Sequence, residues 1–248
     1  MSKRQNIDAI LRDWEFDAQA LSVRRQKGSD GRDILQMRID MGLLQLEVTG
    51  RPDGLRPEGE ETYYDHLVSQ TIMFGDDLEM DEEQCIEADR EFVQFYHRRI
   101  CWLSLREYDL AVRDADHTLA LMDFCRDHSS DEQWTVTHEQ YRPFVLFHRT
   151  QAAALAELED GGRGPEGAIH AINDGLWRIR ELFVAHDAME EYESDELVAK
   201  LQEFREMLRD QFGVGQTLQE KLDKAIAAEQ YELAAQIRDE LARRSQAR

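Results

Sequence analysis

The sequence predicts a mainly α-helical protein with a small N-terminal β-meander and a two-helix hairpin at its C-terminus. Three observations predict it. Apolar and polar residues alternate before residue 50, apolar residues recur at helical spacing from residue 81 onward, and a capped amphipathic segment begins at Thr217. A chain of 248 residues with 42% hydrophobic content can supply one large or two modest cores, although 33% of its residues are charged.

The N-terminal segment, residues 1–57, is predicted to contain the β-meander. Its alternating apolar residues are Leu35, Met37, Ile39, Leu44, Leu46 and Val48. Period-two alternation is typical of half-buried strands, so we expect antiparallel strands here. A helix over 33–48 is the alternative, because Ile34, Met37, Met41 and Leu44 also fit one helical face. A turn rich in Gly and Pro after Val48 ends the segment.

An acidic segment follows. Between Glu58 and Asp89 there are twelve carboxylates and no Lys or Arg. The segment lacks the glycine and the ligand spacing of an EF-hand loop. We therefore expect residues 58–84 to form a solvated linker, and a docking surface for a basic partner is the alternative.

Residues 85–213 are predicted to form a helical domain. Dense apolar positions predict helices over 85–106, 108–126, 140–158 and 165–184. A further helix is expected after Ser194 as its cap, and its apolar stripe consists of Leu197, Leu201, Phe204 and Leu208. Two glycines, Gly213 and Gly215, end that helix and suggest a hinge before the C-terminal motif.

The first helix pair resembles a tetratricopeptide repeat. Trp102 lies in its first helix, Tyr108 at the turn and Ala111 early in the second helix. Ala168 takes the matching place in a second pair, but 57 positions later instead of the repeat's usual number of about 34. The resemblance implies stacked helix pairs with a concave, peptide-binding face. A plain helical bundle is the alternative.

The C-terminal segment is predicted to be a helical hairpin over residues 216–245. Thr217 and Glu220 have the spacing of a capping box, and the apolar stripe of the first helix consists of Leu218, Leu222, Ala225 and Ile226. We expect residues 230–232 to break the helix and a second helix to start at Leu233. Alanines on both sides of the corner would let the helices approach closely, with Tyr231 packed across the turn.

The same residues resemble the UVR motif of the excision-repair proteins UvrB and UvrC. The family's core, Ala-Ala-x-x-Arg-Asp-x-[Ile/Leu], is present from Ala234 to Leu241. The resemblance implies a protein-binding hairpin, and similar hairpins occur in Clp-type unfoldases and in the activator of bacterial protein arginine kinase. It does not extend to the UvrB helicase body, the UvrC nuclease domains or the activator's Cys-x-x-Cys pairs. The implied protein-binding residues are Leu218, Leu222, Ile226, Tyr231, Leu233, Ala234, Ile237, Arg238 and Leu241.

The rest of the sequence indicates no catalytic centre. Gly162–Gly167 matches Gly-x-Gly-x-x-Gly, but it follows a predicted helix instead of a strand. The three cysteines, Cys85, Cys101 and Cys125, offer no zinc pair and are expected to be buried thiols. We expect no enzymatic activity, no cofactor and no metal site.

Charge and hydropathy restrict the partners. A net charge of −22 repels phosphate backbones, so direct nucleic-acid binding is not expected. No run approaches the roughly 20 apolar residues that span a bilayer, and we expect a cytoplasmic protein without membrane contact.

The resulting hypothesis is a cytoplasmic adaptor whose helical body holds one partner and whose hairpin holds another. A Clp-type unfoldase or a UvrB/UvrC-like subunit would be the hairpin's partner. The first alternative is an accessory factor of UvrABC-type nucleotide excision repair that acts through protein contacts. The second is an enzyme with an unrecognised site in the meander or the helical core. A homodimer is also compatible with the resemblance, because UVR hairpins can pair with each other.

Overall fold

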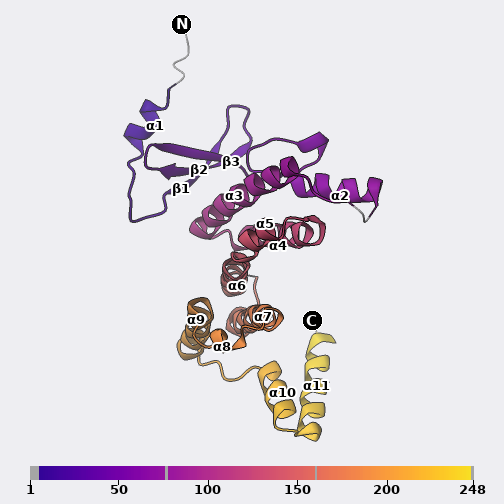
Figure 1. Cartoon of the computed structure of the whole chain (residues 1–248). Helices are drawn as coiled ribbons and strands as arrows, with labels where there is room; N and C mark the ends of the chain where they lie inside the picture. The colour runs from indigo at the N-terminus through magenta and orange to yellow at the C-terminus, as the bar shows by residue number, and fades with distance from the viewer. Residues whose placement is uncertain (1–5, 76–77, 160, 247–248) are drawn as a thin grey trace. The chain divides into compact units, whose positions relative to one another are not determined.

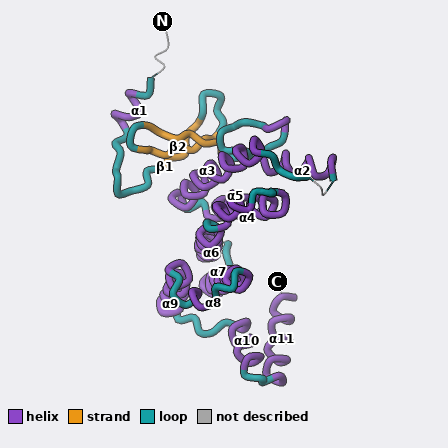
Figure 2. The backbone as a smooth tube through the Cα atoms, in the orientation of Figure 1, coloured by secondary structure: helices purple, strands orange, loops and turns teal. Residues whose placement is uncertain are grey.

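The computed structural model of the chain describes residues 6–75, 78–159 and 161–246, and it divides into two compact units, residues 1–152 and 153–248 (Figures 1 and 2). The division falls inside one helix, Arg142–Leu158, and inside the expected helical domain 85–213, whose limits stay a prediction.

The elements up to α6 are α1 (Asp8–Asp13), β1 (Val23–Lys27), β2 (Asp33–Ile39), β3 (Gly42–Glu47), the 3-10 turn η1 (Pro57–Gly59), α2 (Tyr63–Phe74), α3 (Glu82–Leu105), α4 (Tyr108–His128), α5 (Glu132–Glu139) and α6 (Arg142–Leu158). The following elements are α7 (Gly164–Ala185), α8 (Met189–Tyr192), α9 (Glu196–Phe212), α10 (Leu218–Ala227) and α11 (Tyr231–Gln246).

The three strands form an antiparallel sheet in the order β1-β2-β3 (Figure 1). Met37 in the central strand pairs with Val23 on one side and with Leu44 on the other. Leu35, Met37 and Leu46 are buried and belong to one core cluster with Trp102. The predicted meander is confirmed, and the alternative helix over 33–48 is wrong.

The acidic segment is more structured than expected. Residues 63–74 form α2, so a solvated linker over the whole of 58–84 is the wrong description. Thr62 caps the helix by accepting a hydrogen bond from the Asp65 amide at 3.1 Å, while Tyr63 and Leu67 are buried in the core of the first unit. The carboxylates do not prevent this burial, because one apolar face is enough to anchor a short helix. Asp76 and Asp77 lie outside the described residues.

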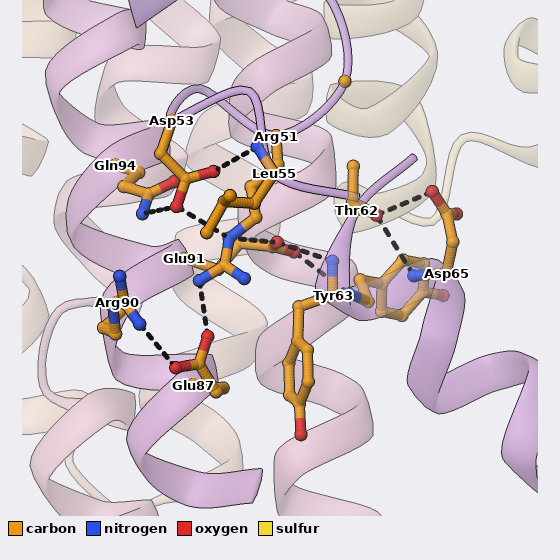
Figure 3. A network of polar contacts seen from close by, with 12 residues as sticks. Arg51, Asp53, Leu55, Thr62, Tyr63, Asp65, Glu87, Arg90, Glu91 and Gln94 are labelled. Carbon is orange, nitrogen blue, oxygen red and sulfur yellow. Dashed lines mark hydrogen bonds and ion pairs between the residues drawn. The ribbon is translucent and has the colours of Figure 1, made fainter. Parts of the chain in front are cut away.

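A buried carboxylate fastens α2 to α3 (Figure 3). Glu91 of α3 is fully buried and accepts hydrogen bonds from the amides of Tyr63 and Tyr64, at 2.7 and 3.0 Å. Arg51 bridges from the preceding loop to Glu87, with 2.8 Å between Nη2 and Oε2. The arrangement satisfies free amides at the start of α2 and places a negative charge at the positive end of its dipole.

The helices α3 and α4 pack against each other in antiparallel fashion, joined by a turn in which Arg106 has φ of 61°. Arg98 of α3 and Asp114 of α4 form a buried ion pair, with 2.7 Å between Nε and Oδ2. The Trp102 indole donates to the same carboxylate at 3.0 Å, and Arg98 also donates to the Gly50 carbonyl at 2.7 Å. These bonds tie the loop after β3 to the helix pair. The expected helices 85–106 and 108–126 are confirmed, whereas α5 had not been predicted.

In the second unit, α7 packs against α8 and α9 around the buried residues Ile169, Ile172 and Ile179. The cap of α9 is Asp195, whose Oδ1 accepts from the Leu197 and Val198 amides at 2.9 Å each. The expectation of Ser194 as the cap was therefore wrong by one residue. Carboxylate and hydroxyl oxygens can both cap a helix, so sequence alone does not choose between these adjacent residues.

The expected helices over 140–158 and 165–184 correspond to α6 and α7, and α9 ends at Gly213 as predicted. The resemblance to tetratricopeptide repeats stays a prediction. In the described part of the chain, no helix combines the length and the apolar character needed to cross a membrane.

Candidate protein-binding hairpin

The N-terminus of α10 is fixed by a complete capping box. The Thr217 hydroxyl oxygen accepts from the Glu220 amide at 3.2 Å, and Glu220 Oε2 accepts from the Thr217 amide at 2.7 Å. This reciprocal pair satisfies two amides that would otherwise lack partners at the helix end. The predicted capping box is confirmed.

The corner between the helices is tighter and earlier than expected. Residues 228–230 form it, and Glu229 adopts the left-handed conformation with φ of 56°. The Gln230 amide donates to the Ala225 carbonyl at 2.8 Å, which closes the turn. The break expected at residues 230–232 is thus wrong in position, and α11 begins at Tyr231.

Two alanines occupy the contact between α10 and α11. Ala225 is 2% exposed and Ala234 is 8% exposed, whereas Ala228 and Ala235 are exposed to solvent. Because an alanine side chain is a single methyl group, the helix backbones can approach closely at this point. Close approach through small residues is confirmed for the first two alanines only.

Tyr231 does not pack across the turn. It is 68% exposed, and backbone hydrogen bonds such as the one from Gln230 to Ala225 close the corner without it. Ile226 is 52% exposed and Leu233 is 44% exposed. These three residues, which we call the corner patch, are large apolar side chains within eight consecutive residues at the bend of the hairpin.

The other predicted binding residues have different environments. Leu218, Leu222 and Ile237 are partly buried. The Arg238 guanidinium is exposed and lies 3.7 Å from Asp239 on the same helix. The side chain of Leu241 lies outside those that the structure describes.

Glu220 also joins the hairpin to the rest of the second unit. Its Oε1 accepts a hydrogen bond from Asn173 of α7 at 3.0 Å and pairs with Arg209 of α9. Asn173 in turn accepts from Arg205 at 2.8 Å. Burial works against ionisation of Glu220, but the hydrogen bonds from Thr217 and Asn173 and the charge of Arg209 hold its pKa below the ordinary value. The sequence identified Glu220 as a capping residue, but it contained no signal for this second role.

Residues 216–246 match the family model described as UvrB/uvrC motif. Comparisons with curated proteins and with solved structures gave no match. The matched segment contains both helices of the hairpin and all nine predicted binding residues. The C-terminal hairpin is therefore a UVR motif, and such a motif indicates interaction with other proteins in general.

The described residues contain no group of three or more His, Cys, Asp or Glu side chains that could hold a metal ion. Cys101 and Cys125 are buried as expected, while Cys85 is only partly buried. Burial raises the pKa of the Cys101 thiol to about 12, which makes it a poor nucleophile. The glycines of 162–167 lie at the start of α7 after α6, without the strand that a dinucleotide fingerprint requires.

Proposed function

We propose that the protein is a non-enzymatic adaptor that binds a partner protein through the corner patch of its UVR hairpin and a second partner through its helical body. The observation that carries the proposal is the exposure of Ile226, Tyr231 and Leu233 within the segment that matches the UVR motif. Large apolar side chains grouped on a short hairpin gain free energy when a partner removes them from water.

The free energy gained by burying these three side chains supports docking to a partner. Full burial of one large apolar side chain contributes roughly 1.5–3 kcal/mol, so three of them can dominate the affinity of a small interface. Tyrosine is enriched among the residues that dominate such interfaces. Among the described side chains of the hairpin, the buried hydrophobic ones are the small Ala225 and Ala234, and docking would therefore add to its stability.

The charge of the chain favours protein partners. With a formal net charge of −22, nonspecific attraction to nucleic acid is opposed at any distance within a Debye length. A cytoplasmic partner with an apolar groove is the kind of partner that this proposal requires. A Clp-type unfoldase and a UvrB/UvrC-like subunit are the partners that we propose to test, and pairing of two hairpins in a homodimer is a third arrangement.

A second candidate function is an accessory role in UvrABC-type nucleotide excision repair. It is favoured by the description of the matching model, which names the motif of UvrB and UvrC. In this version the hairpin occupies the contact that those subunits use with each other, and the protein reaches DNA only through them.

Direct binding assays distinguish these versions. The intact chain is titrated against a purified UvrC-like subunit and against a purified Clp-type unfoldase, and its own mass is measured by analytical ultracentrifugation. Binding of the repair subunit that is lost on replacing the corner patch with serines supports the repair role, whereas binding of the unfoldase alone supports the general adaptor. If neither partner binds and the chain is monomeric, both versions fail.

A further inference from the structure

Arg99 of α3 is a buried cation without a carboxylate partner. It is 2% exposed, and its Nη1 donates to the Thr118 hydroxyl oxygen at 3.0 Å. The Thr118 hydroxyl itself donates to the Asp114 carbonyl, so its oxygen is free to accept. The Arg99 Nε finds no acceptor, and among the described residues no carboxylate forms an ion pair with this guanidinium. This is unusual in a chain with 52 Asp and Glu.

The charge on Arg99 persists at neutral pH. Burial lowers its pKa to about 10, still well above 7. Burial and the neighbouring Arg99 charge lower the pKa of His148 to about 4, so this histidine is neutral beside it. The nearest acidic group of the helix pair, Asp114, is already bonded to Arg98 and Trp102. The face of the Tyr96 ring, 5.9 Å from Arg99 Cζ, compensates this buried charge only in part, so an anion beside the guanidinium would lower its free energy.

Arg99 is one of the residues that line a cavity of about 780 Å³ in the first unit. Its walls are mainly apolar and include Phe92, Val93, Tyr96, Met122, Phe144 and Val145, from α3, α4 and α6. The volume lies in the usual range of roughly 300–1,000 Å³ for small-molecule sites. A fixed cation in a mainly apolar cavity is the pattern that orients a small amphiphilic ligand.

Asp89 defines the other end of the cavity. It lies ten residues before Arg99 on α3, a separation of roughly 15 Å along a helix. Its carboxylate accepts from the Trp134 indole at 2.9 Å and lies 2.7 Å from His138 Nε2. A negative group on a ligand is therefore attracted to the Arg99 end and repelled from the Asp89 end, and an apolar body fits between them.

We propose that this cavity binds an elongated organic monocarboxylate, with its carboxylate on Arg99 and its apolar body along Phe92 and Tyr96. Arginine recognises a carboxylate through parallel hydrogen bonds, and the cavity offers one cation, which matches one negative charge. A phosphate or a dicarboxylate would bring charge that the acidic chain opposes. The site lies in the first unit, and the proposal does not rest on the adaptor function.

Decanoate and its uncharged analogue decan-1-ol are suitable probes for isothermal titration calorimetry on the full chain. We expect decanoate to bind more tightly than decanol. Arg99→Met should weaken decanoate by about 10- to 100-fold, the value of a charge-assisted hydrogen bond, and leave decanol little changed. Arg90→Gln is the matched control, because Arg90 is on the same helix and exposed and should leave both affinities unchanged.

Val93→Trp tests the location without touching the buried charge. Val93 lines the cavity but is 55% exposed, so a larger ring there is tolerated by the fold and reduces the space for both probes. We expect both affinities to fall. The proposal is overturned if the intact chain does not bind decanoate, if decanoate and decanol bind equally, or if either the folded Arg99→Met chain or the folded Val93→Trp chain binds decanoate like the intact chain.

Discussion

Asn173 and Glu220 connect the body of the second unit to its UVR hairpin, with 3.0 Å between Asn173 Nδ2 and Glu220 Oε1. The other carboxylate oxygen closes the capping box of α10 at the Thr217 amide. One side chain therefore both starts the first helix of the hairpin and attaches that helix to α7 and α9. The orientation of α10 within the second unit depends on it.

Removal of this carboxylate should loosen the hairpin locally. We expect Glu220→Ala to weaken α10 by about 0.5–2 kcal/mol, the usual cost of losing a cap, without unfolding α7 and α9. Amide hydrogen exchange measured by mass spectrometry should rise at residues 217–222. Glu229→Ala, at an exposed position in the corner, is the control and should leave exchange in this region unchanged.

The same contact should depend on pH. The folded-state pKa of Glu220 is lowered from its ordinary value of 4.5, so its stabilising effect is complete above pH 4.5 and is lost as the pH falls through the lowered pKa. NMR spectra of the amides of residues 217–222 should show release of α10 on acidification. In Glu220→Gln this step should disappear; an unchanged acid transition would mean that another group controls the attachment.

The contact between the two hairpin helices should tolerate no larger side chain. Ala234→Leu forces bulk between α10 and α11, and overpacking of this kind costs about 1–3 kcal/mol. Ala235→Leu adds the same atoms at the neighbouring exposed position and should have little effect. Thermal unfolding of the full-length variants, followed by circular dichroism and by hydrogen exchange in the hairpin, distinguishes them. Equal effects of both variants would contradict the described helix contact.

The buried ion pair between α3 and α4 should contribute more to the free energy of unfolding than a surface ion pair does. Asp114→Asn leaves Arg98 without its counter-charge in a buried site, and we expect a loss of about 3–5 kcal/mol in the free energy of unfolding. Asp127→Asn removes an exposed carboxylate that pairs with the exposed Arg126, and it should cost about 1 kcal/mol or less. Urea unfolding of the two variants measures both values. Similar losses would contradict the buried pair.

The periodicity of apolar residues predicts most of the helices and strands, because these elements are determined by residues that are close together in the sequence. The alternation at Leu35 and Met37 located the sheet, and the apolar stripe at Leu201 and Leu208 located α9. The sequence does not predict helix α2, because the acidic composition of its surroundings favours a solvated linker. A single apolar face on Tyr63 and Leu67 buries that helix all the same.

The candidate site was predicted in part. The UVR match and the capping box at Thr217 follow from short, local patterns. The exposure of Tyr231 and the bond from Asn173 to Glu220 depend on how the helices pack, and sequence spacing carries no information about a contact 47 residues apart. The sequence does not predict the unpaired Arg99 either, because a count of Asp and Glu residues does not show which carboxylates form ion pairs with other residues.

Binding of a partner protein by the corner patch is tested most directly by affinity capture from lysate, read by quantitative mass spectrometry. Four baits are compared: the intact chain, a chain ending at Gly215, the corner-patch variant Ile226→Ser/Tyr231→Ser/Leu233→Ser, and the control Ile72→Ser/Met73→Ser. The control removes exposed apolar side chains from α2, far from the hairpin in sequence.

We predict that one partner is captured by the intact chain and by the control, and is lost from both the truncated chain and the corner-patch variant. That partner would also name the pathway. If all four baits retain the same proteins, the hairpin does not dock a partner and the account of its function is wrong.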